Sequence, residues 1–424
     1  MAGRAPARSV FPFHLFLSTP MTYLRRSSLA LLVTIALAPT AAAAQQVRTL
    51  PAPDATFAEP FSQVGAANVR ELRNGRVIVA DPRDKILQMI DLASGSSTKI
   101  GREGSGPAEF GLPLRLFAAP GDTTLVFDPG NSRYLVVAPD GKPVHTFRLE
   151  SPPAANTGGG MRMGGMSIAR AADAQGRLYS EGSGFAMGPD GPTTSDSAPI
   201  LRYDRARQKS DTIGMVKLAR NNVQRSGGQG NMRVMIGGSN PLAARDEWTV
   251  FPDGRVAIVR ASDYRVDWVM PDGAQRSSAP IRYSPIRMTA ADIKEEEALR
   301  ITARASQMSM TMTNDNGNQR SSVSMGAPAG APPPPPITDW PEVKPPFRPN
   351  FQSVWARSNG ELWVRRTEPA GAKGTLYDVI NAQGAVTHQV RVPEGLTVVG
   401  MGNGTVYTTK LDEDDLQYLQ RHRM

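Results

Sequence analysis

The chain has no cysteine, and this absence excludes disulfide cross-links, thiolate nucleophiles and cysteine-ligated metal centres. Aromatic residues make up only 6% of the 424 residues, so little side-chain surface is available for stacking on nucleic-acid bases. Glycine (40 residues) and proline (36 residues) are abundant instead, which favours many turns and few helices. Stability must therefore come from the packing of a turn-rich core, for which 40% hydrophobic residues suffice.

The apolar run Leu29–Ala38 falls short of the roughly 20 residues that a membrane-spanning helix needs. It follows Arg25 and Arg26 and precedes the small residues Ala41–Ala44, which is the order of a secretory signal. We therefore expect residues 1–44 to be a signal peptide. The mature protein is then exported, periplasmic or extracellular, and has no membrane span.

Cleavage is expected just before Gln45, and Met21 is the expected start of translation. The first 20 residues are then a gene-start artefact or an unusually long charged region. The leader carries four arginines and no acid, so its removal lowers the formal charge from +9 to about +5. Such a balance is mild for a chain of this size.

Basic residues are concentrated between residues 201 and 234, where Asp204 and Asp211 are the acids and Tyr203 is the one aromatic residue. A nucleic-acid surface needs stacking aromatics among its basic residues. We therefore interpret the stretch as a solvated loop, rather than as a patch for an anionic partner, and expect no nucleic-acid partner. The basic residues are Arg202, Arg205, Arg207, Lys209, Lys217, Arg220, Arg225 and Arg233.

A unit of four short strands separated by glycine turns recurs along the chain. In the first copy, a strand at residues 69–72 leads through an Asn-Gly turn to RVIVAD, then to KILQMID, a second turn and STKIG. The alternation of Val77 with Val79, and of Leu362 with Val364 in a later copy, is typical of half-buried strands. Asn-Gly, Asp-Gly and Gln-Gly pairs are typical of tight hairpins, so each unit is a four-stranded meander.

Six copies of this unit align, with insertions of unequal size between them. A single meander cannot bury both of its faces, so several must stack around an axis, and six of them make a β-propeller. We predict an all-β chain: a six-bladed β-propeller of four-stranded antiparallel blades over residues 45–424. Residues 47–65 should supply the closing outer strand, because the last copy ends near its third strand. The turn glycines that define the copies are Gly75, Gly121, Gly176, Gly254, Gly360 and Gly404.

The stretch GREGSGPAEF at residues 101–110 is glycine-rich, as phosphate-binding loops are. A P-loop needs Lys-Ser/Thr after its last glycine, and a dinucleotide-binding loop needs a following helix. Here Pro107 and then a strand-like segment follow, so neither condition holds. We interpret the stretch as the connection from the outer strand of the first blade to the inner strand of the second, where glycine permits a positive φ.

The pattern G-x-x-G-x-GP-x-EF in this loop, together with the blade repeat, resembles the secreted six-bladed β-propeller proteins of bacteria that are related to the NHL-repeat group. The resemblance extends over nearly the whole mature chain and implies a fold. It implies no catalytic residues, since members of this group are mostly without an assigned activity. The loop residues that carry it are Gly101, Gly104, Gly106, Pro107, Glu109 and Phe110.

An insertion interrupts the propeller at residues 289–345. A helix is expected at residues 290–304, because a capping-box-like start at Thr289 precedes it and Glu296 and Arg300 form an i,i+4 pair. The Met-rich and Pro-rich residues that follow have no apolar period and predict a disordered tether.

Methionines in M-x-M spacing lie in this tether and in a second one between the second and third blades. Thioethers can bind Cu(I), but neither Cys nor His accompanies them, so drift of a low-complexity composition is the favoured interpretation. We expect no metal and no cofactor. The methionines are Met161, Met163, Met166, Met308, Met310 and Met312.

Arginines on the predicted inner strands are the candidate binding residues. Arg70, Arg115, Arg170 and Arg357 all fall in these strands, at the end where the inter-blade loops enter. Converging arginines would favour a ligand with a carboxylate or phosphate. The alternative interpretation, which we favour, is that Asp81, Asp128 or Glu109 on the same face pairs with them.

Asp81 and Asp128 end the second strands of the first two copies and complete the candidate set on the channel face. The matching positions of the other copies carry Gly182, Arg260, Arg366 and Lys410, which makes a poor metal cage. We expect the two aspartates to accept hydrogen bonds from turns. Trp248 and Trp355, in equivalent inner strands, are expected to pack between blades.

Three functions remain open at this point. The first is a monomeric, non-enzymatic propeller that binds a small anionic ligand or an envelope protein through its channel face. The second is a metal-dependent propeller enzyme of the lyase or lactone-hydrolase type, and the third is a structural ring that docks envelope proteins. A basic or mixed channel would favour the binding module, whereas acids converging on the axis would favour the enzyme.

Overall fold

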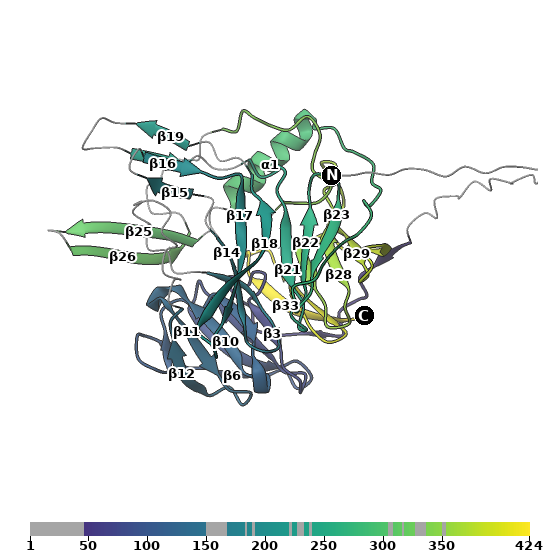
Figure 1. Ribbon diagram of the computed structural model, residues 1–424. Coiled ribbons are helices and arrows are strands. Elements are labelled where there is room, and N and C mark those ends of the chain that lie inside the picture. The colour runs from purple at the N-terminus through teal and green to yellow at the C-terminus, as the bar shows by residue number, and fades with distance from the viewer. Residues whose placement is uncertain are drawn as a thin grey trace, which may run out of the picture. The chain divides into compact units, whose positions relative to one another are not determined.

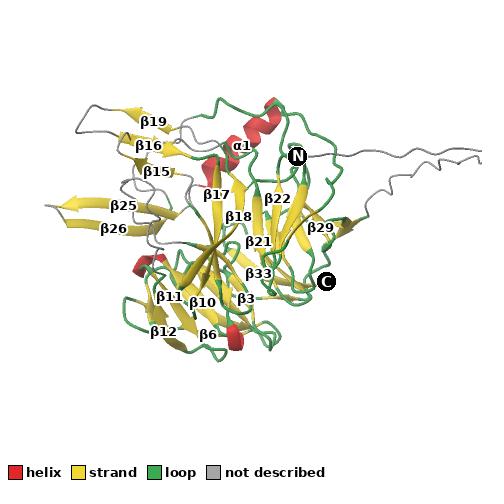
Figure 2. Cartoon of the chain, in the orientation of Figure 1, coloured by secondary structure: helices red, strands yellow, loops and turns green. Residues whose placement is uncertain are grey.

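The computed structural model is a six-bladed β-propeller of four-stranded blades, one of which gains a fifth strand. Figure 1 labels strands of these blades. The predicted fold class is therefore confirmed. Strands dominate the described chain, and α1 (Ala290–Ala303) is the one α-helix within it (Figure 2). The residues described are 46–149, 168–182, 185–188, 191–219, 223–226, 233–236, 240–303, 308–315, 318–326, 336–349 and 353–424.

Each blade runs through antiparallel hairpins from an inner strand to an outer strand. Blade 1 contains β3 (Val69–Glu71), β4 (Val77–Asp81), β5 (Ile86–Asp91) and β6 (Ser96–Lys99). Blade 2 contains β9 (Arg115–Ala118), β10 (Thr124–Asp128), β11 (Arg133–Val137) and β12 (Pro143–Phe147). Blade 3 contains β13 (Ala169–Ala172), β14 (Leu178–Glu181), β17 (Ser197–Asp204) and β18 (Lys209–Lys217).

The remaining blades follow the same order. Blade 4 contains β21 (Glu247–Val250), β22 (Val256–Arg260), β23 (Arg265–Val269) and β24 (Gln275–Ser277). Blade 5 contains β27 (Val354–Ala356), β28 (Leu362–Arg365), β29 (Thr375–Ile380) and β30 (Val386–Val392). Blade 6 contains β31 (Leu396–Met401), β32 (Thr405–Leu411) and β33 (Gln417–Arg423). Short 3-10 turns lie at Pro120–Asp122 and Pro129–Asn131.

The N-terminal segment closes the ring, as predicted. Strand β2 (Ala55–Thr56) pairs antiparallel with β33 and supplies the outer strand of blade 6. The amide of Phe57 extends this ladder by donating to the carbonyl of Leu419 at 2.9 Å. Strand β1 (Val47–Thr49), which the repeat did not predict, adds to the edge of blade 5 parallel to β30. The strands β1 and β2 and the C-terminal strand β33 therefore lie in the last two blades.

The core consists of six hydrophobic clusters, one at each interface between adjacent blades. Blade 1 shows how a strand serves two of them. Val77 and Val79 of β4 pack in the cluster shared with blade 6, whereas Ile78 and Ala80 pack in the cluster shared with blade 2. Second strands are therefore buried on both faces, and the expectation of half-buried strands is wrong. Stacking of blades is what covers the second face.

The tryptophans pack as expected between blades. Trp248 is 2% exposed in the cluster between blades 3 and 4. Trp355 is partly buried against the cluster between blades 5 and 6.

The GREGSGPAEF loop connects β6 to β9, as interpreted from the sequence. Within it, β7 (Arg102–Glu103) and β8 (Glu109–Phe110) form a short parallel pair. The Glu109 carboxylate accepts from the amide of Gly106 at 2.7 Å and from Nε of Arg102 at 2.8 Å. Gly101 has φ +63°, a conformation that glycine adopts without strain. The loop is a corner of the fold whose carboxylate is engaged internally.

Helix α1 has the predicted start but a different pairing. The Thr289 amide donates to the Asp292 carboxylate at 2.8 Å, and the Asp292 amide donates back to the Thr289 hydroxyl at 3.3 Å, which closes a capping box. Arg300 pairs with Glu297 at 2.6 Å rather than with Glu296. The carboxylate of Glu296 instead binds the Arg348 guanidinium through both oxygens. Tertiary contacts thus override the i,i+4 pair.

Three further hairpins are inserted in the propeller. They are β15 (Phe185–Gly188) with β16 (Gly191–Thr194), β19 (Val223–Ser226) with β20 (Arg233–Ile236), and β25 (Met308–Asp315) with β26 (Asn318–Met325). The last pair replaces the expected disordered tether between residues 308 and 325 with an antiparallel ladder of backbone hydrogen bonds. The other expected tether, with Met161, Met163 and Met166, lies outside the described residues.

Replacing Gly101 with alanine should lower the free energy of unfolding by about 3 kcal/mol, measured by urea titration. The residue would keep a φ of +63°, and the added Cβ would lie 2.6 Å from the carbonyl oxygen of Ala108. Gly95→Ala is the matched control, because φ is +71° there and no atom lies within 4 Å of the added Cβ. The control should lose only about 1 kcal/mol. Equal losses would contradict a tightly fixed loop.

Asp292→Asn should lower the free energy of unfolding by about 2 kcal/mol at pH 7. Burial opposes ionisation of Asp292, but hydrogen bonds from Lys344 and Thr289 outweigh it and lower its pKa from 3.8 to about 2. A carboxyl whose pKa falls on folding stabilises the protein above its unfolded pKa, and this contribution is lost as the pH drops from about 4 to about 2. Urea titrations at descending pH should therefore show the free energies of unfolding of wild type and Asp292→Asn becoming equal.

Glu59→Gln, at an exposed carboxyl, provides the control for this titration and should leave the stability unchanged at every pH. A difference between wild type and Asp292→Asn that stays constant from pH 7 to pH 3 would show that the ionised carboxylate is not what anchors α1.

Candidate functional site

Charged side chains lie on the inner strands of the ring. Around it, β3 lies beside β9, β9 beside β13, β13 beside β21, β21 beside β27, and β31 beside β3. Arg115 opens β9, and Arg170 is the second residue of β13. Because these two strands are neighbours, the two arginines are brought together at the end where the inter-blade loops enter.

Five residues form what we term the channel-side cluster: Arg115, Arg170, Glu181, Arg245 and Glu247. Nη1 of Arg170 lies 2.5 Å from the Glu181 carboxylate, and its Nη2 lies 2.7 Å from the Glu247 carboxylate. Nη2 of Arg245 donates to both oxygens of Glu181, at 3.0 and 3.1 Å. Two guanidinium groups and two carboxylates thus connect blade 3 to blade 4.

Strand geometry explains these positions. Glu181 ends β14, whereas Glu247 begins β21 and is fully buried. Nε1 of Trp248 donates to Glu181 at 2.9 Å, and the Arg170 guanidinium lies 4.8 Å from the centre of the Trp248 ring. The tryptophan therefore fixes one partner by a hydrogen bond and the other by a cation–π contact.

The two carboxylates differ in their ionisation. Burial favours the neutral form of Glu181, but Arg170 and Arg245 outweigh it and hold its pKa below the usual value. Burial raises the pKa of Glu247 even though the same arginines oppose the shift. Oε1 of Glu247 lies 3.1 Å from Nε of Arg245 without hydrogen-bond alignment, and it has no hydrogen-bond partner among the described residues.

Arg115 differs from Arg170 in its surroundings. One of its Nη atoms donates to the carbonyl of Ala169 at 3.0 Å. The pKa of Arg115 is lowered to about 10. Burial is the larger cause, and the positive charge of Arg170 is the second. The environment of this guanidinium therefore disfavours its charge, which an anion beside it would stabilise.

The other two predicted arginines are engaged elsewhere. Arg70, on β3, pairs with Asp122 at 2.8 Å and donates to the Thr124 hydroxyl at 2.6 Å, which ties blade 1 to blade 2. Arg357 follows the last residue of β27 and pairs with Glu361 at 2.8 Å. It therefore lies at the opposite end of its inner strand from Arg115, contrary to the expectation that all four arginines share one end.

Asp81 and Asp128 accept hydrogen bonds from backbone amides, as expected from their strand-end positions. Asp81 accepts from its own turn and from the amides of Ser62 and Gln63, at 2.7 and 3.1 Å. Burial raises the pKa of Asp81, although these amides oppose the shift. Asp128 accepts from the amides of Gly111 and Leu112 in the loop between the first two blades. Both carboxylates fix connecting segments to the blades.

Sequence reasoning missed Glu181, Arg245 and Glu247. A signal for Glu247 was present, because an acid in the otherwise apolar strand EWTV needs a buried partner. No pattern in the sequence indicated that Arg245, which precedes this strand, would form an ion pair with Glu181. That contact depends on how blades 3 and 4 meet.

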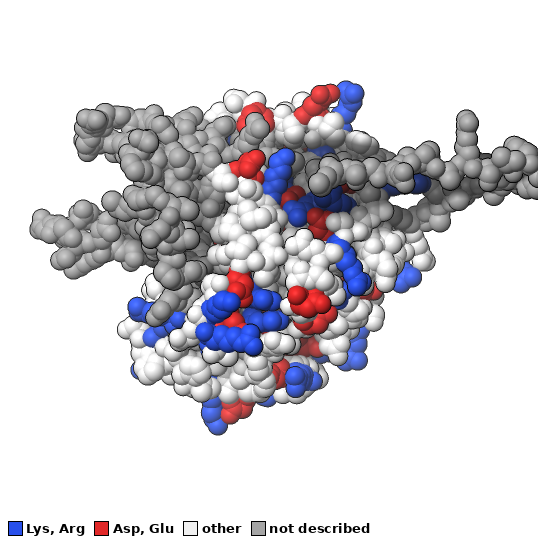
Figure 3. All heavy atoms as spheres, in the orientation of Figure 1, with Lys and Arg blue, Asp and Glu red and all other residues white. Residues whose placement is uncertain are grey.

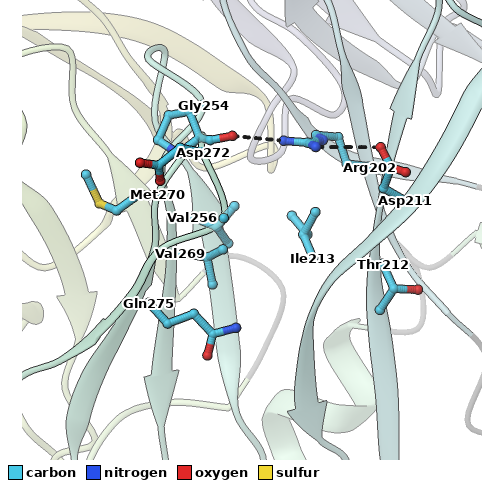
Figure 4. A pocket seen from close by; sticks show the side chains of 12 residues that line it. Arg202, Asp211, Thr212, Ile213, Gly254, Val256, Val269, Met270, Asp272 and Gln275 are labelled. Atoms are coloured by element: carbon cyan, nitrogen blue, oxygen red, sulfur yellow. Dashed lines mark hydrogen bonds and ion pairs between the residues drawn. The ribbon is translucent and has the colours of Figure 1, made fainter.

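A groove of about 260 Å³ lies between the outer part of blade 3 and blade 4 (Figure 4). Thr212 and Ile213 line one side and Val256 and Val269 the other, as the close-up shows. Arg202 spans the groove, donating to the carbonyl of Pro271 at 3.5 Å and lying 3.6 Å from Asp211. The guanidinium thus bridges the two blades along this seam.

Acids accompany the described part of the basic stretch. Arg207 lies 3.9 Å from Asp204, and Lys209 lies 3.2 Å from Asp211. On the face drawn in Figure 3, basic and acidic side chains are likewise interspersed. The described portion of the stretch is therefore of mixed charge, and it forms outer strands of blade 3 and a hairpin rather than the expected loop.

The described part of the chain holds no group of three or more His, Cys, Asp or Glu side chains placed to bind a metal ion. In the same residues, no helix combines the length and the apolar character needed to cross a bilayer.

Comparison with known proteins yields solved structures alone. No family model matches the chain, and no curated protein matches it by sequence. A DUF4221-family member from Bacteroides vulgatus aligns at a TM-score of 0.43 and 8% identity, over 88% of this chain and 95% of that one. The gluconolactonase XC5397 from Xanthomonas campestris aligns at 0.36 and 8%, over 87% and 91%.

The virginiamycin B lyase from Staphylococcus aureus aligns at a TM-score of 0.33 and 9% identity, over 87% of each chain. At such values we draw nothing about activity from these likenesses. The assignment of the six-bladed propeller rests on the strand pairings of this chain.

Proposed function

We propose that this protein is an exported β-propeller that binds a small anionic ligand at the channel-side cluster, with the Arg115 guanidinium as the contacting cation. The observation that carries the proposal is the electrostatic position of Arg115. Burial and the neighbouring charge of Arg170 lower its pKa to about 10. A carboxylate or phosphate beside it would offset both effects and accept hydrogen bonds from its planar donor set.

The remaining members of the cluster hold Arg170 in place. Glu181 and Glu247 each bind one of its Nη atoms, so this side chain presents a fixed positive charge beside Arg115. Preorganised charge costs little to arrange when a ligand arrives. The two arginines are thus unequal: Arg170 is held by acids, and Arg115 is the one proposed to meet the ligand.

The opposite pKa shifts of Glu181 and Glu247 favour a second candidate, a propeller enzyme. Two neighbouring carboxyls with pKa values pushed apart are suited to general acid and general base roles. Both carboxylates are bound by arginines, however, and acting as a base would require breaking those ion pairs. We therefore place the binding function first.

Arg115→Gln should weaken binding of small anions at least tenfold, because it removes a charge-assisted hydrogen bond worth about 1.5–3 kcal/mol. Calorimetric titrations with citrate, succinate and glycerol 3-phosphate would measure this, alongside native mass spectrometry and elemental analysis of the untreated protein. Arg207→Gln removes the same charge from a side chain that is 83% exposed and should change nothing.

Equal affinities of wild type and Arg115→Gln would overturn the proposed site. Stoichiometric calcium in the untreated protein would favour the enzyme instead. If the wild-type protein binds none of the small anions but binds an acidic peptide, the anionic group that it recognises belongs to a partner protein.

Arg170→Gln should lower the free energy of unfolding by about 3 kcal/mol at pH 7, since it leaves the buried Glu247 and the half-buried Glu181 with Arg245 as the one cation among the described residues that pairs with both. Burial already raises the pKa of Glu247, and loss of Arg170 would raise it further. A carboxyl whose pKa rises on folding destabilises the protein as the pH rises above its unfolded pKa. Urea titrations should therefore show a smaller deficit at pH 5 than at pH 7.

Adding Glu247→Gln to this variant removes the carboxylate that has lost its partner and should restore part of the stability at pH 7. A deficit that is independent of pH and of the second substitution would show that Arg170 acts through packing alone.

A further inference from the structure

A small pocket lies between helix α1 and blade 5, away from the inner strands. Its volume is about 80 Å³, which is room for two or three water molecules at roughly 30 Å³ each. Side chains of α1 form one wall, Lys344 and Arg348 a second, and the connection from β28 to β29 a third. The insertion and the propeller thus enclose it together.

The acids that line this pocket all have partners. Asp292 pairs with Lys344, and both side chains are almost fully buried. Glu296 pairs with Arg348, and Glu368 pairs with Arg391 at 2.5 Å. Glu295 accepts from the amide of Gly371 at 2.9 Å. Three of the four acids are therefore paired with cations, and Glu295 is held by a backbone amide.

Arg365, the last residue of β28, is a cation of this pocket that is not part of these ion pairs. Among the residues that the structure describes, its guanidinium forms neither a hydrogen bond nor an ion pair, although it lines the pocket. Burial lowers the pKa of Arg365, and the nearby charge of Arg348 acts in the same direction, although Tyr377, Glu296 and Glu368 oppose the shift. A cation held in this way is costly unless an anion compensates it.

A second polar group in the pocket lacks a partner. Thr367 is 5% exposed, and its buried hydroxyl oxygen makes no hydrogen bond to any described residue. It lies two positions after Arg365 and lines the same pocket. A buried hydroxyl without a partner costs about 1–3 kcal/mol, so its presence points to a missing acceptor or donor.

We propose that this pocket binds a small oxyanion, with the Arg365 guanidinium and the Thr367 hydroxyl as its donors. The guanidinium offers two parallel N–H groups to a carboxylate, sulfate or phosphate, and the hydroxyl donates to a further oxygen. The size of the pocket restricts the ligand to an inorganic oxyanion or to the acidic group of a larger molecule. Bound there, the anion would join α1 to blade 5 and stabilise the docked insertion.

Calorimetry and thermal unfolding of the full chain with sodium phosphate, sulfate or acetate, each against sodium chloride of equal ionic strength, test this site. At least one oxyanion should bind and raise the Tm beyond the chloride control, since a ligand that binds only the folded state stabilises it. Arg365→Gln should weaken this binding at least tenfold, and Thr367→Val roughly fivefold. Stronger binding of phosphate or sulfate than acetate would indicate a tetrahedral anion, and the reverse a carboxylate.

Two controls separate this site from its surroundings. Arg287→Gln removes a charge that is 83% exposed and should not alter the effect. Arg115→Gln removes anion binding at the channel-side cluster, so the loss caused by Arg365→Gln should be the same in an Arg115→Gln background. Without ligand, Arg365→Gln should melt no lower than wild type, because it removes a half-buried cation that forms no ion pair with a described residue. The proposal is overturned if all three oxyanions match chloride, or if Arg365→Gln retains the wild-type response.

Discussion

The packing of one blade against the next is the constraint on which the rest of this structure depends. A four-stranded blade of about 30 residues has no core of its own, and its second strand is apolar on both faces, as Val77 to Ala80 show. Only neighbours on both sides cover it, so the blades must form a closed ring. Closure in turn requires β2, from the opposite end of the chain, to complete blade 6.

Charged residues are used along the same interfaces. Arg70 ties blade 1 to blade 2 through Asp122, and Arg170 ties blade 3 to blade 4 through Glu247. Such ion pairs gain from the low dielectric of the interface only where each charge has a partner, and removal of one partner is costly. Burial lowers the pKa of Arg115 and of Arg365, so at these two positions burial works against a positive charge.

These two arginines suggest different roles for the two parts of the protein. Arg115 lies on an inner strand of the ring, beside a charge that Glu181 and Glu247 hold fixed, and is the residue that we propose for ligand recognition. Arg365 lies where the inserted helix meets the propeller, in a small pocket. An anion there would act on the docking of the insertion, because both elements form the walls.

The sequence by itself determined the repeat, and the repeat determined the fold. The turn glycine of each unit has a φ between +70° and +88° in all six copies. Asp81 and Asp128, at the ends of second strands, accept hydrogen bonds from turn amides. Both features could be predicted because they are local and recur with the repeat. Only the tertiary structure decided which charges meet. The Arg170–Glu247 and Lys344–Asp292 pairs join residues 77 and 52 positions apart. Glu296 forms an ion pair with Arg348 rather than with Arg300 on its own helix. Side-chain ion pairs depend on the register between blades, which the period of a single blade does not encode.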